Sequence, residues 1–157
     1  MHELPRFIKY NKEIGETPLE ALNRLKAERP ELNDIRLAYA GRLDPQASGE
    51  LLILVGDECK NRDHYQGLDK TYTFDLLVGF STDTGDIMGL IDKIDLTSTL
   101  KEQDLEQALL RFIGTVEQKF PIYSSQTVDG KPLWKWAKEG RVDEIKIPEE
   151  SISLDRT

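Results

Sequence analysis

Two apolar runs, at residues 37–40 and 51–55, stand on either side of a short polar stretch in the first third of the chain. The second run is apolar at every position, which predicts a strand buried on both faces in the middle of a sheet. Between the runs, residues 41–49 hold two glycines and a proline, which predicts an irregular loop joining two strands. Asp44 is the only acid in this loop, and Pro45 restricts its backbone to extended angles. The pattern therefore predicts a carboxylate on a rigid support, although a solvated loop aspartate beside a proline is the more ordinary interpretation.

The rest of the chain predicts short strands and helices. Residues 17–20 form a capping box with proline at the first helical position, so a helix is expected from there until Pro30 stops it. Residues 99–102 form a second capping box, and apolar residues then recur at helical spacing up to Gly114. Asp129 and Gly130 predict a hairpin turn. The other expected strands lie at residues 6–10, 70–78, 89–94, 115–119 and 124–128, and the other helices at 57–65 and 133–139.

Length and composition indicate a single globular domain. A chain of 157 residues with 38% hydrophobic and 32% charged residues can bury a core and is too short to favour several domains. No apolar run approaches the ~20 residues that a membrane helix needs, and no secretory signal is visible. Cys59 is the one cysteine, so no internal disulfide can form. We therefore expect a cytoplasmic protein without a membrane partner.

The net charge of −8 argues against a general nucleic-acid binder, because such proteins gain affinity when their cations displace counterions from phosphates. The cations are nevertheless grouped in sequence. One group surrounds the Asp44 loop and the other follows the expected hairpin turn: Arg36, Arg42, Lys60, Arg62 and Lys70, and then Lys131, Lys135, Lys138 and Arg141. Trp134 and Trp136 belong to the second region, but two residues apart on a helix they cannot share a face, so at least one is expected in the core.

Metal chemistry finds little support in the sequence. Residues 82–86 alternate acids with small residues, but their spacing does not match an EF-hand calcium loop, and no helix is expected before them. The chain also lacks a cluster of cysteines and histidines. Residues 82–86 are therefore predicted to form a tight polar turn before a strand.

The Asp44 loop reads GRLDP at residues 41–45 and ASG at residues 47–49, and this string resembles the catalytic-aspartate motif of the TruB family of tRNA pseudouridine synthases. Further segments match the family in the same order, at residues 12–17, 69–72, 82–89, 121–125 and 130–140. The resemblance covers most of the chain from about Lys12 to Gly140. Its specificity lies in the Asp44 loop and in the order of the segments.

The resemblance implies an enzyme that isomerises uridine to pseudouridine in RNA, in particular in the T-loop of tRNA, with Asp44 as the catalytic carboxylate. The target uridine must be flipped out of its stack to be reached. Asp44 would act as a nucleophile or as a base, and the family mechanism leaves that choice open. Because the reaction changes no oxidation state, neither a cofactor nor a metal is expected. With the predicted elements, the resemblance implies an α+β fold, a mixed and largely antiparallel sheet with flanking helices, over a single domain of residues 1–157.

The resemblance also implies contacts to the substrate from six further residues: Tyr72, Lys12, Arg42, Lys70, Tyr39 and Asp86. Tyr72 would stack on the target uracil, and the three cations would hold phosphate or shape the loop. Asp86 belongs to a family motif beside the active site, and Tyr39 stands where bacterial members carry a histidine. Ordinary alternatives exist, because a tyrosine at the start of a strand often fills the core and a lysine such as Lys12 often lies on the surface.

The chain departs from the family pattern in ways that leave other hypotheses open. Glu13 stands where a proline is usual, and family members continue through strands that supply an arginine paired with the catalytic aspartate. Arg156 only superficially resembles that arginine. The alternatives are therefore a weak catalyst, an RNA-binding or scaffold domain without turnover, and a fragment of a longer synthase. A sheet edge left uncovered by missing strands would favour self-association.

Overall fold

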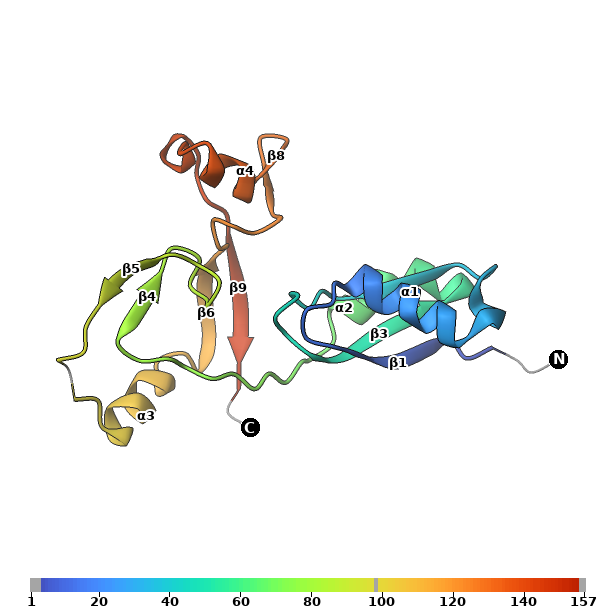
Figure 1. The fold of residues 1–157 in the computed structure, drawn as a ribbon, viewed down its shortest axis with the longest axis horizontal. Coiled ribbons are helices and arrows are strands. Elements are labelled where there is room, and N and C mark those ends of the chain that lie inside the picture. Colours follow the sequence, from blue (N-terminus) through green and yellow to red (C-terminus); the bar gives the residue numbers. More distant parts are fainter. Residues whose placement is uncertain (1–3, 98, 156–157) are drawn as a thin grey trace. The chain divides into compact units, whose positions relative to one another are not determined.

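The computed structural model describes residues 4–97 and 99–155 (Figure 1). The chain divides into two compact units, Met1–Thr73 and Phe74–Thr157, and each is described by itself. Every strand pair in the described residues is antiparallel, so the predicted α+β fold with largely antiparallel pairing is confirmed. The assignment of both units to one domain stays a prediction. Across the same described ranges, no helix is long and apolar enough to span a bilayer.

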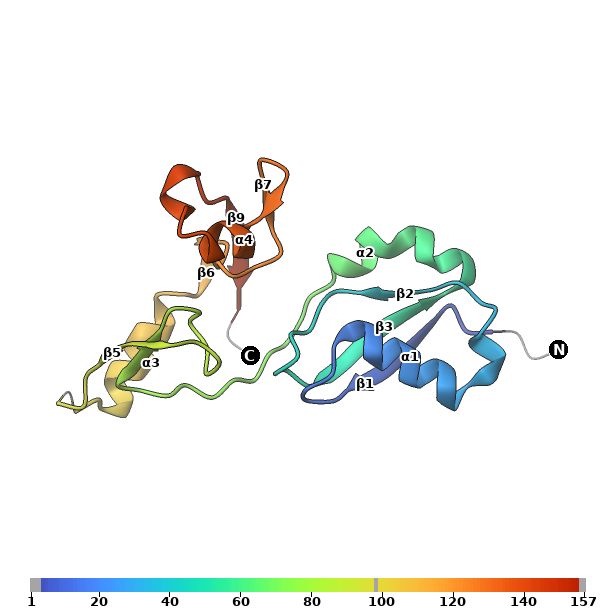
Figure 2. The same cartoon turned by 45° about the horizontal axis from the view of Figure 1, so that its top comes forward.

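The first unit is built on a three-stranded sheet, with strands β1 (Phe7–Lys12), β2 (Leu37–Ala40) and β3 (Gly49–Val55). Their order is β1-β3-β2, so β3 is the central strand, as its unbroken apolar run predicts. The register places Lys12 opposite Gly49 and Ala40 opposite Leu52. The end of β1 and both ends of the β2–β3 loop therefore lie at one end of the sheet (Figure 2).

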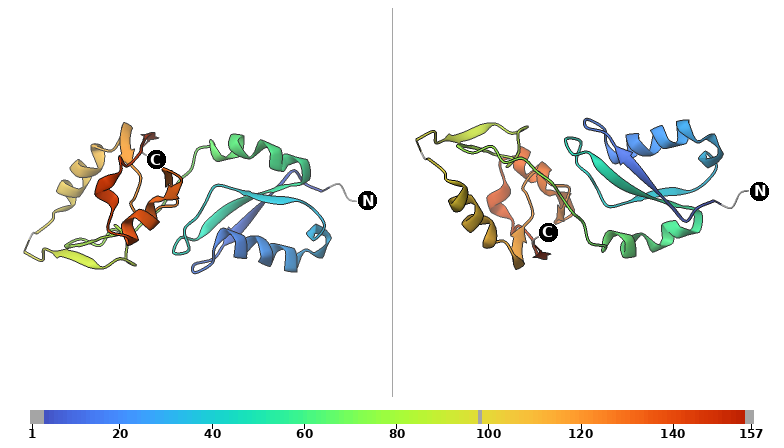
Figure 3. Two further views of the ribbon diagram at one scale, coloured as in Figure 1. Left: turned by 90° about the horizontal axis from the view of Figure 1, so that it is seen from above. Right: turned by 90° about the horizontal axis from the view of Figure 1, so that it is seen from below.

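Helices cover both faces of this sheet (Figure 3). One face packs against α1 (Pro18–Glu28), and the shared core consists of Ala21, Leu22, Leu25, Leu32, Leu51 and Ile53. The other face lies against the 3-10 helix η2 (Gly56–Asn61) and α2 (Arg62–Gln66). Leu54, which alternates with its neighbour Ile53 along β3, is fully buried as well. The central strand thus buries side chains in both directions.

The predicted start of α1 is confirmed. The Glu20 amide donates to the Thr17 hydroxyl at 3.2 Å, and the Thr17 amide donates to the Glu20 carboxylate at 2.7 Å. Each side chain thereby satisfies a backbone donor that the first helical turn would leave without a partner. The helix ends before Pro30, where the 3-10 helix η1 (Pro30–Leu32) begins.

In its described residues, the second unit contains three strand pairs, two α-helices and one 3-10 helix. In chain order its elements are β4 (Phe80–Thr82), β5 (Ile91–Ile94), α3 (Glu102–Leu110), β6 (Gly114–Lys119), β7 (Thr127–Val128), β8 (Lys131–Pro132), α4 (Leu133–Lys138), the 3-10 helix η3 (Val142–Glu144) and β9 (Glu149–Leu154). The pairs are β4 with β5, β6 with β9, and β7 with β8. Residues 120–148 therefore form an insertion between β6 and β9. Among the described residues of the second unit, the buried apolar ones are Leu133 and Trp136, and both lie in this insertion.

The prediction of a strand at residues 70–78 is wrong. The structure has no helix or strand between Gly67 and Gly79, and the alternating apolar side chains of this segment are exposed. Alternation tells which face of a strand would be buried, but a strand exists only when another strand pairs with its backbone. No strand that the structure describes pairs with this segment.

Other boundaries also differ from the prediction. The helix predicted to be capped at Thr99 has Lys101 as its N-cap, and the Lys101 amide donates to the Asp104 carboxylate at 3.1 Å. A lysine ammonium cannot accept a hydrogen bond in return, so only half of a capping box forms. The strand expected at residues 124–128 is confined to β7, and β9 was not predicted.

The expected hairpin turn is confirmed between β7 and β8. Val128 pairs with Lys131, which leaves Asp129 and Gly130 as a two-residue loop. Their φ angles are 50° and 76°, the left-handed values that the favoured two-residue hairpin turn requires. The adjacent α4 ends before Gly140, as predicted.

Candidate active site

Asp44 lies in the β2–β3 loop, at the end of the first sheet. The Ala47 amide donates to the Asp44 carbonyl at 2.9 Å, which makes a turn inside the loop. The Gly15 amide donates to the Pro45 carbonyl at 2.7 Å, which ties this loop to the one between β1 and α1. Asp44 itself is exposed. Its carboxylate is thus accessible from solvent, on a backbone held by hydrogen bonds at its own carbonyl and at that of Pro45.

Lys12 ends β1 and is fully buried. Its ammonium donates to the carbonyl of Glu13 at 3.0 Å and to that of Glu16 at 2.7 Å. The lysine thereby closes the loop of residues 13–16 from inside, and its interpretation as a surface lysine is wrong. Its predicted contact with RNA stays a prediction.

Two residues that the sequence analysis missed, Glu16 and Arg24, form an ion pair over the same loop. Arg24 Nε lies 2.8 Å from Glu16 Oε1, and Arg24 Nη2 lies 3.1 Å from Glu16 Oε2. This guanidinium lowers the pKa of the Glu16 carboxyl to about 2. The two residues are eight positions apart across the start of α1, so neither helical nor strand spacing points to the pair. Their opposite charges were the available signal.

Tyr39 lies in β2 opposite Ile53 and packs against the core of the first unit. Arg62 of α2 donates from Nε to the Tyr39 carbonyl at 3.2 Å, and its guanidinium carbon lies 5.8 Å from the centre of the Tyr39 ring. That separation permits a cation–π contact. Arg42 is exposed on the Asp44 loop itself. Of the cations grouped around Asp44 in sequence, Arg42 therefore lies on the loop itself, and Arg62 lies beside the strand that leads into it.

Lys70 and Tyr72 follow α2 in the segment without helix or strand. The Lys70 ammonium donates to the carbonyls of Gln66 at 2.7 Å and Leu68 at 2.8 Å, so it binds the end of the preceding helix. Tyr72 is 65% exposed, so its interpretation as a core residue is wrong. Its ring faces solvent and offers a surface on which a base could stack.

Asp86 lies in the second unit, in the predicted polar turn between β4 and β5. Its carboxylate accepts hydrogen bonds from the Thr84 hydroxyl at 2.7 Å and from the Met88 amide at 2.9 Å. A Cβ at Gly89 would lie closer than 3.0 Å to side-chain atoms of Asp83 and Thr84, so the turn requires glycine there. These contacts hold the shape of the turn, and the predicted role of Asp86 toward substrate stays a prediction.

The second group of cations surrounds the two tryptophans of α4. Lys131 Nζ lies 3.5 Å from the centre of the Trp136 ring, and the Arg141 guanidinium carbon lies 5.2 Å from it. Trp134 is approached by Lys135 at 5.5 Å and by Lys138 at 5.2 Å. Trp136 is buried and Trp134 half-buried, which confirms that at least one of them belongs to a core.

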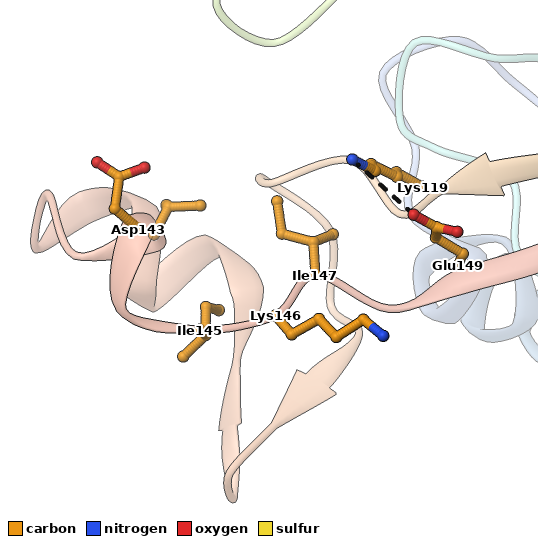
Figure 4. Close-up of a pocket in the computed structure, with 7 residues that line it drawn as sticks. Lys119, Asp143, Ile145, Lys146, Ile147 and Glu149 are labelled. Atoms are coloured by element: carbon orange, nitrogen blue, oxygen red, sulfur yellow. Dashed lines mark ion pairs between the residues drawn. The ribbon is translucent and has the colours of Figure 1, made fainter.

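A cavity of about 350 Å³ lies elsewhere in the second unit, next to the ends of β6 and β9 (Figure 4). Lys119 and Glu149 form an ion pair of 3.8 Å at its margin. The residues that line it are Lys119, Val142, Asp143, Ile145, Lys146, Ile147 and Glu149. None of the predicted substrate contacts is among them.

The structure thus brings four of the predicted site residues to one end of the first sheet. Lys12 ends β1 there, Tyr39 lies in the strand that leads into the loop, and Arg42 and Asp44 are in the loop. Lys70 and Tyr72 follow in the same unit, and Asp86 lies in the other one. Arg156, which resembled the family arginine only superficially, lies outside the described residues.

Comparison with known proteins identifies the family. The model of the "TruB family pseudouridylate synthase (N terminal domain)" matches residues 29–156, which include the whole Asp44 loop. The chain therefore belongs to the TruB family, and the resemblance seen in its motifs is confirmed.

Individual relatives agree with this assignment. The chain is 34% identical over 145 residues to the tRNA pseudouridine synthase B of Fusobacterium nucleatum, an alignment that covers 92% of this chain and 48% of that protein. It is 37% identical over 141 residues to the protein of the same name from Borreliella burgdorferi, covering 89% of this chain and 48% of that protein. It is 33% identical over 147 residues to the tRNA pseudouridine synthase B of Bacillus pumilus, covering 93% of this chain and 46% of that protein. The chain spans about half the length of these curated relatives.

Proposed function

We propose that this chain carries the catalytic aspartate of a tRNA pseudouridine synthase and isomerises a uridine in the T-loop of tRNA. The observation that carries the proposal is the Asp44 loop, an exposed carboxylate on a fixed backbone within the region matched to the TruB family. The name shared by the relatives supports tRNA as the substrate. We place the reaction in the cytoplasm, where the Cys59 thiol stays reduced.

The proposed chemistry is an isomerisation in which all atoms are retained. The C1′–N1 bond breaks, the uracil turns, and C1′ joins C5, while C5 loses a proton and N1 gains one. Asp44 acts on the flipped nucleoside as a nucleophile at C1′ or as a base, and both roles need an ionised carboxylate that the substrate can reach. The exposure of Asp44 supplies that access.

The RNA backbone is held by local cations in spite of the acidic chain. Residues 131–141 contain four cations and one acid, a net charge of +3 within a chain of −8. Trp134 among these cations suits a contact in which a base stacks on the ring while lysines approach the phosphates. In the first unit, Arg42 supplies positive charge on the Asp44 loop, and Arg62 supplies it beside the strand that leads into this loop. The placement of the cations, and not their total number, therefore supports RNA as the partner.

Turnover is tested directly with a T-stem-loop RNA that carries uridine labelled with tritium at C5. Single-turnover incubation with the chain is expected to release tritium into water, because C5 loses its hydrogen when it joins C1′. Binding of the RNA without release would favour the alternative of an RNA-binding domain without turnover. Absence of both binding and release would contradict the proposal altogether.

Tyr72 is proposed to stack on the flipped uracil. Tyr72→Ala is expected to weaken binding of the T-stem-loop by ~1–3 kcal/mol, whereas Tyr72→Phe keeps the ring and most of the affinity. Titration of a fluorescently labelled RNA, followed by anisotropy, measures both. Because the side chain is 65% exposed, the alanine variant should unfold with a free energy within about 0.5 kcal/mol of wild type.

The matched control for Tyr72 is Phe112→Ala, which removes another exposed aromatic ring from a place outside the family motifs. Its RNA affinity should equal that of wild type. An equal loss of RNA affinity in both alanine variants, or no loss of affinity in either, would contradict the stacking role of Tyr72.

We also propose that the chain self-associates through residues 74–78. Phe74, Leu76 and Leu77 are between 61% and 69% exposed in a segment whose backbone is in no sheet. An exposed apolar segment that pairs with no strand in the described part of the chain favours pairing with a second copy. Sedimentation equilibrium is expected to give a mass that rises above the monomer with concentration, and Leu76→Lys should lower it. A monomeric mass over a hundredfold range of concentration would contradict self-association.

A further inference from the structure

The loop between β1 and α1 contacts the Asp44 loop through its backbone. The Gly15 amide donates to the Pro45 carbonyl at 2.7 Å. The bonded carbonyl belongs to the peptide group between Pro45 and Gln46, and Pro45 directly follows Asp44, so this bond fixes the backbone one residue after the carboxylate. Whatever holds residues 13–16 in place therefore also influences the position of Asp44.

Arg24 and Glu16 close this loop from the solvent side. The two-contact pair between their side chains is accompanied by a bond from Arg24 Nη2 to the Asn11 carbonyl at 2.7 Å. The Glu16 carboxylate also accepts the Glu13 amide at 2.9 Å. One guanidinium thus joins the strand before the loop to the last residue of the loop, and the Tyr10 ring lies 4.6 Å beneath it. Arg24 also reaches Glu28 at 3.3 Å.

We propose that Glu16 and Arg24 are positioning residues that hold Asp44 in its reactive geometry through the Gly15–Pro45 hydrogen bond. This inference rests on the proposed function, because it assumes that Asp44 reacts. Neither residue touches the substrate. Their pair keeps the loop of residues 13–16 closed, and the closed loop keeps the Gly15 amide directed at the Pro45 carbonyl. A displacement of about 1 Å at a reacting group lowers turnover by ~10²-fold, so a small opening of this loop is enough to be measured.

The test compares wild type with Arg24→Gln, Arg24→Lys and Glu16→Gln. The pair is partly buried, with side chains 36% and 14% exposed, and single ion pairs near the surface contribute only a small part of the free energy of unfolding, so these variants should fold. The lysine keeps the charge but loses the planar fork, and the Glu16→Gln change keeps size while removing the anion. Glu16→Gln also keeps the test open if Arg24→Gln disturbs folding.

The first measurement is amide hydrogen exchange by NMR. The Gly15 amide is expected to exchange at least tenfold faster in Arg24→Gln and Glu16→Gln, and by an intermediate amount in Arg24→Lys. The Val55 amide, which donates to the Arg6 carbonyl at 2.9 Å on another part of the sheet, should keep its rate. The second measurement is turnover: kcat should fall roughly tenfold with KM unchanged, because the geometry changes while the substrate contacts remain.

Arg29→Gln is the matched control. Arg29 lies at the C-terminal end of α1, and its side chain has the same 36% exposure as that of Arg24. It forms an ion pair of 2.9 Å with Glu31, which is not part of the loop of residues 13–16. This variant should change neither Gly15 exchange nor kcat.

The outcomes separate the inference from the proposed function. Unchanged Gly15 exchange in Arg24→Gln and Glu16→Gln would overturn the inference whatever the activity. Faster exchange with wild-type kcat would overturn it too, while leaving the proposed function standing. A wild-type chain without turnover would contradict the proposed function and, with it, the positioning role, and Gly15 exchange would then report only whether the loops are linked.

Discussion

Replacing Asp44 by asparagine is expected to abolish pseudouridine formation while leaving the fold intact. The two side chains are nearly isosteric, but the amide lacks the charge, the basicity and the nucleophilicity of the carboxylate. A loss of at least ~10³-fold in the single-turnover rate is expected, the scale seen when a residue acting directly on the substrate is removed. Because Asp44 is exposed, the free energy of unfolding should change by less than about 0.5 kcal/mol. Tritium release from C5 measures the rate, and urea unfolding measures the stability.

Asp34→Asn provides the control for this experiment, because Asp34 is another exposed aspartate of the first unit and lies outside the Asp44 loop. It should turn over RNA at the wild-type rate. Equal turnover by the Asp44 variant would exclude this carboxylate as the reacting group. Loss of activity in both variants would point to a general effect of removing an acid.

Lys12→Met should destabilise the first unit by ~2–4 kcal/mol. Methionine fills a similar volume but cannot donate, so the partly buried carbonyls of Glu13 and Glu16 would lose their bonds to the fully buried ammonium. A buried acceptor left without a partner costs about 1–3 kcal/mol, and two partly buried ones together are expected to cost a similar or slightly larger amount, partly offset because a buried charge is removed at the same time. Both tryptophans lie in the second unit, so their fluorescence does not report on this change. Amide exchange along β1 and far-ultraviolet circular dichroism during urea unfolding do report on it.

Lys9→Met is the matched control, with the same substitution on the same strand. Lys9 is exposed and forms a surface ion pair with Glu50 at 3.0 Å, a kind of contact that contributes ~0–1 kcal/mol. The expected difference between the two variants therefore exceeds about 1 kcal/mol. A Lys12 variant no less stable than the Lys9 variant would show that the buried hydrogen bonds do not support the fold.

Elements that depend on close neighbours in sequence could be predicted. The Thr17 cap, the stop before Pro30 and the turn at Asp129 and Gly130 each rest on contacts within a few positions, and all are present. The segment of residues 70–78 carries an equally clear strand pattern and is not a strand. Pairing needs a second segment from elsewhere in the chain, and alternation within one segment contains no information about that partner. The unpredicted pairing of β9 with β6 has the same origin.

In the candidate site, too, the features set by neighbouring residues could be predicted, and those set by the fold could not. The rigid mounting of Asp44 follows from the proline and glycines around it, and hydrogen bonds from Ala47 and Gly15 hold that loop in the structure. The burial of Lys12 and the pair of Arg24 with Glu16 could not be predicted in this way. They arise because the fold sets the start of α1 beside the end of β1, and charge alone does not distinguish a buried lysine from an exposed one.

The insertion of residues 120–148 leaves the β6–β9 ladder at Lys119 and returns to it at Glu149, and these two residues are direct partners in the register. The entropic cost of closing such a loop grows by only about 0.6 kcal/mol for each doubling of its length. Evolution can therefore lengthen, shorten or exchange this part of the chain while the ladder that supports it stays the same. The basic and aromatic residues around α4 belong to this insertion, whereas Asp44 belongs to the sheet of the first unit, so the proposed RNA contacts and the proposed catalytic geometry are free to diverge at different rates.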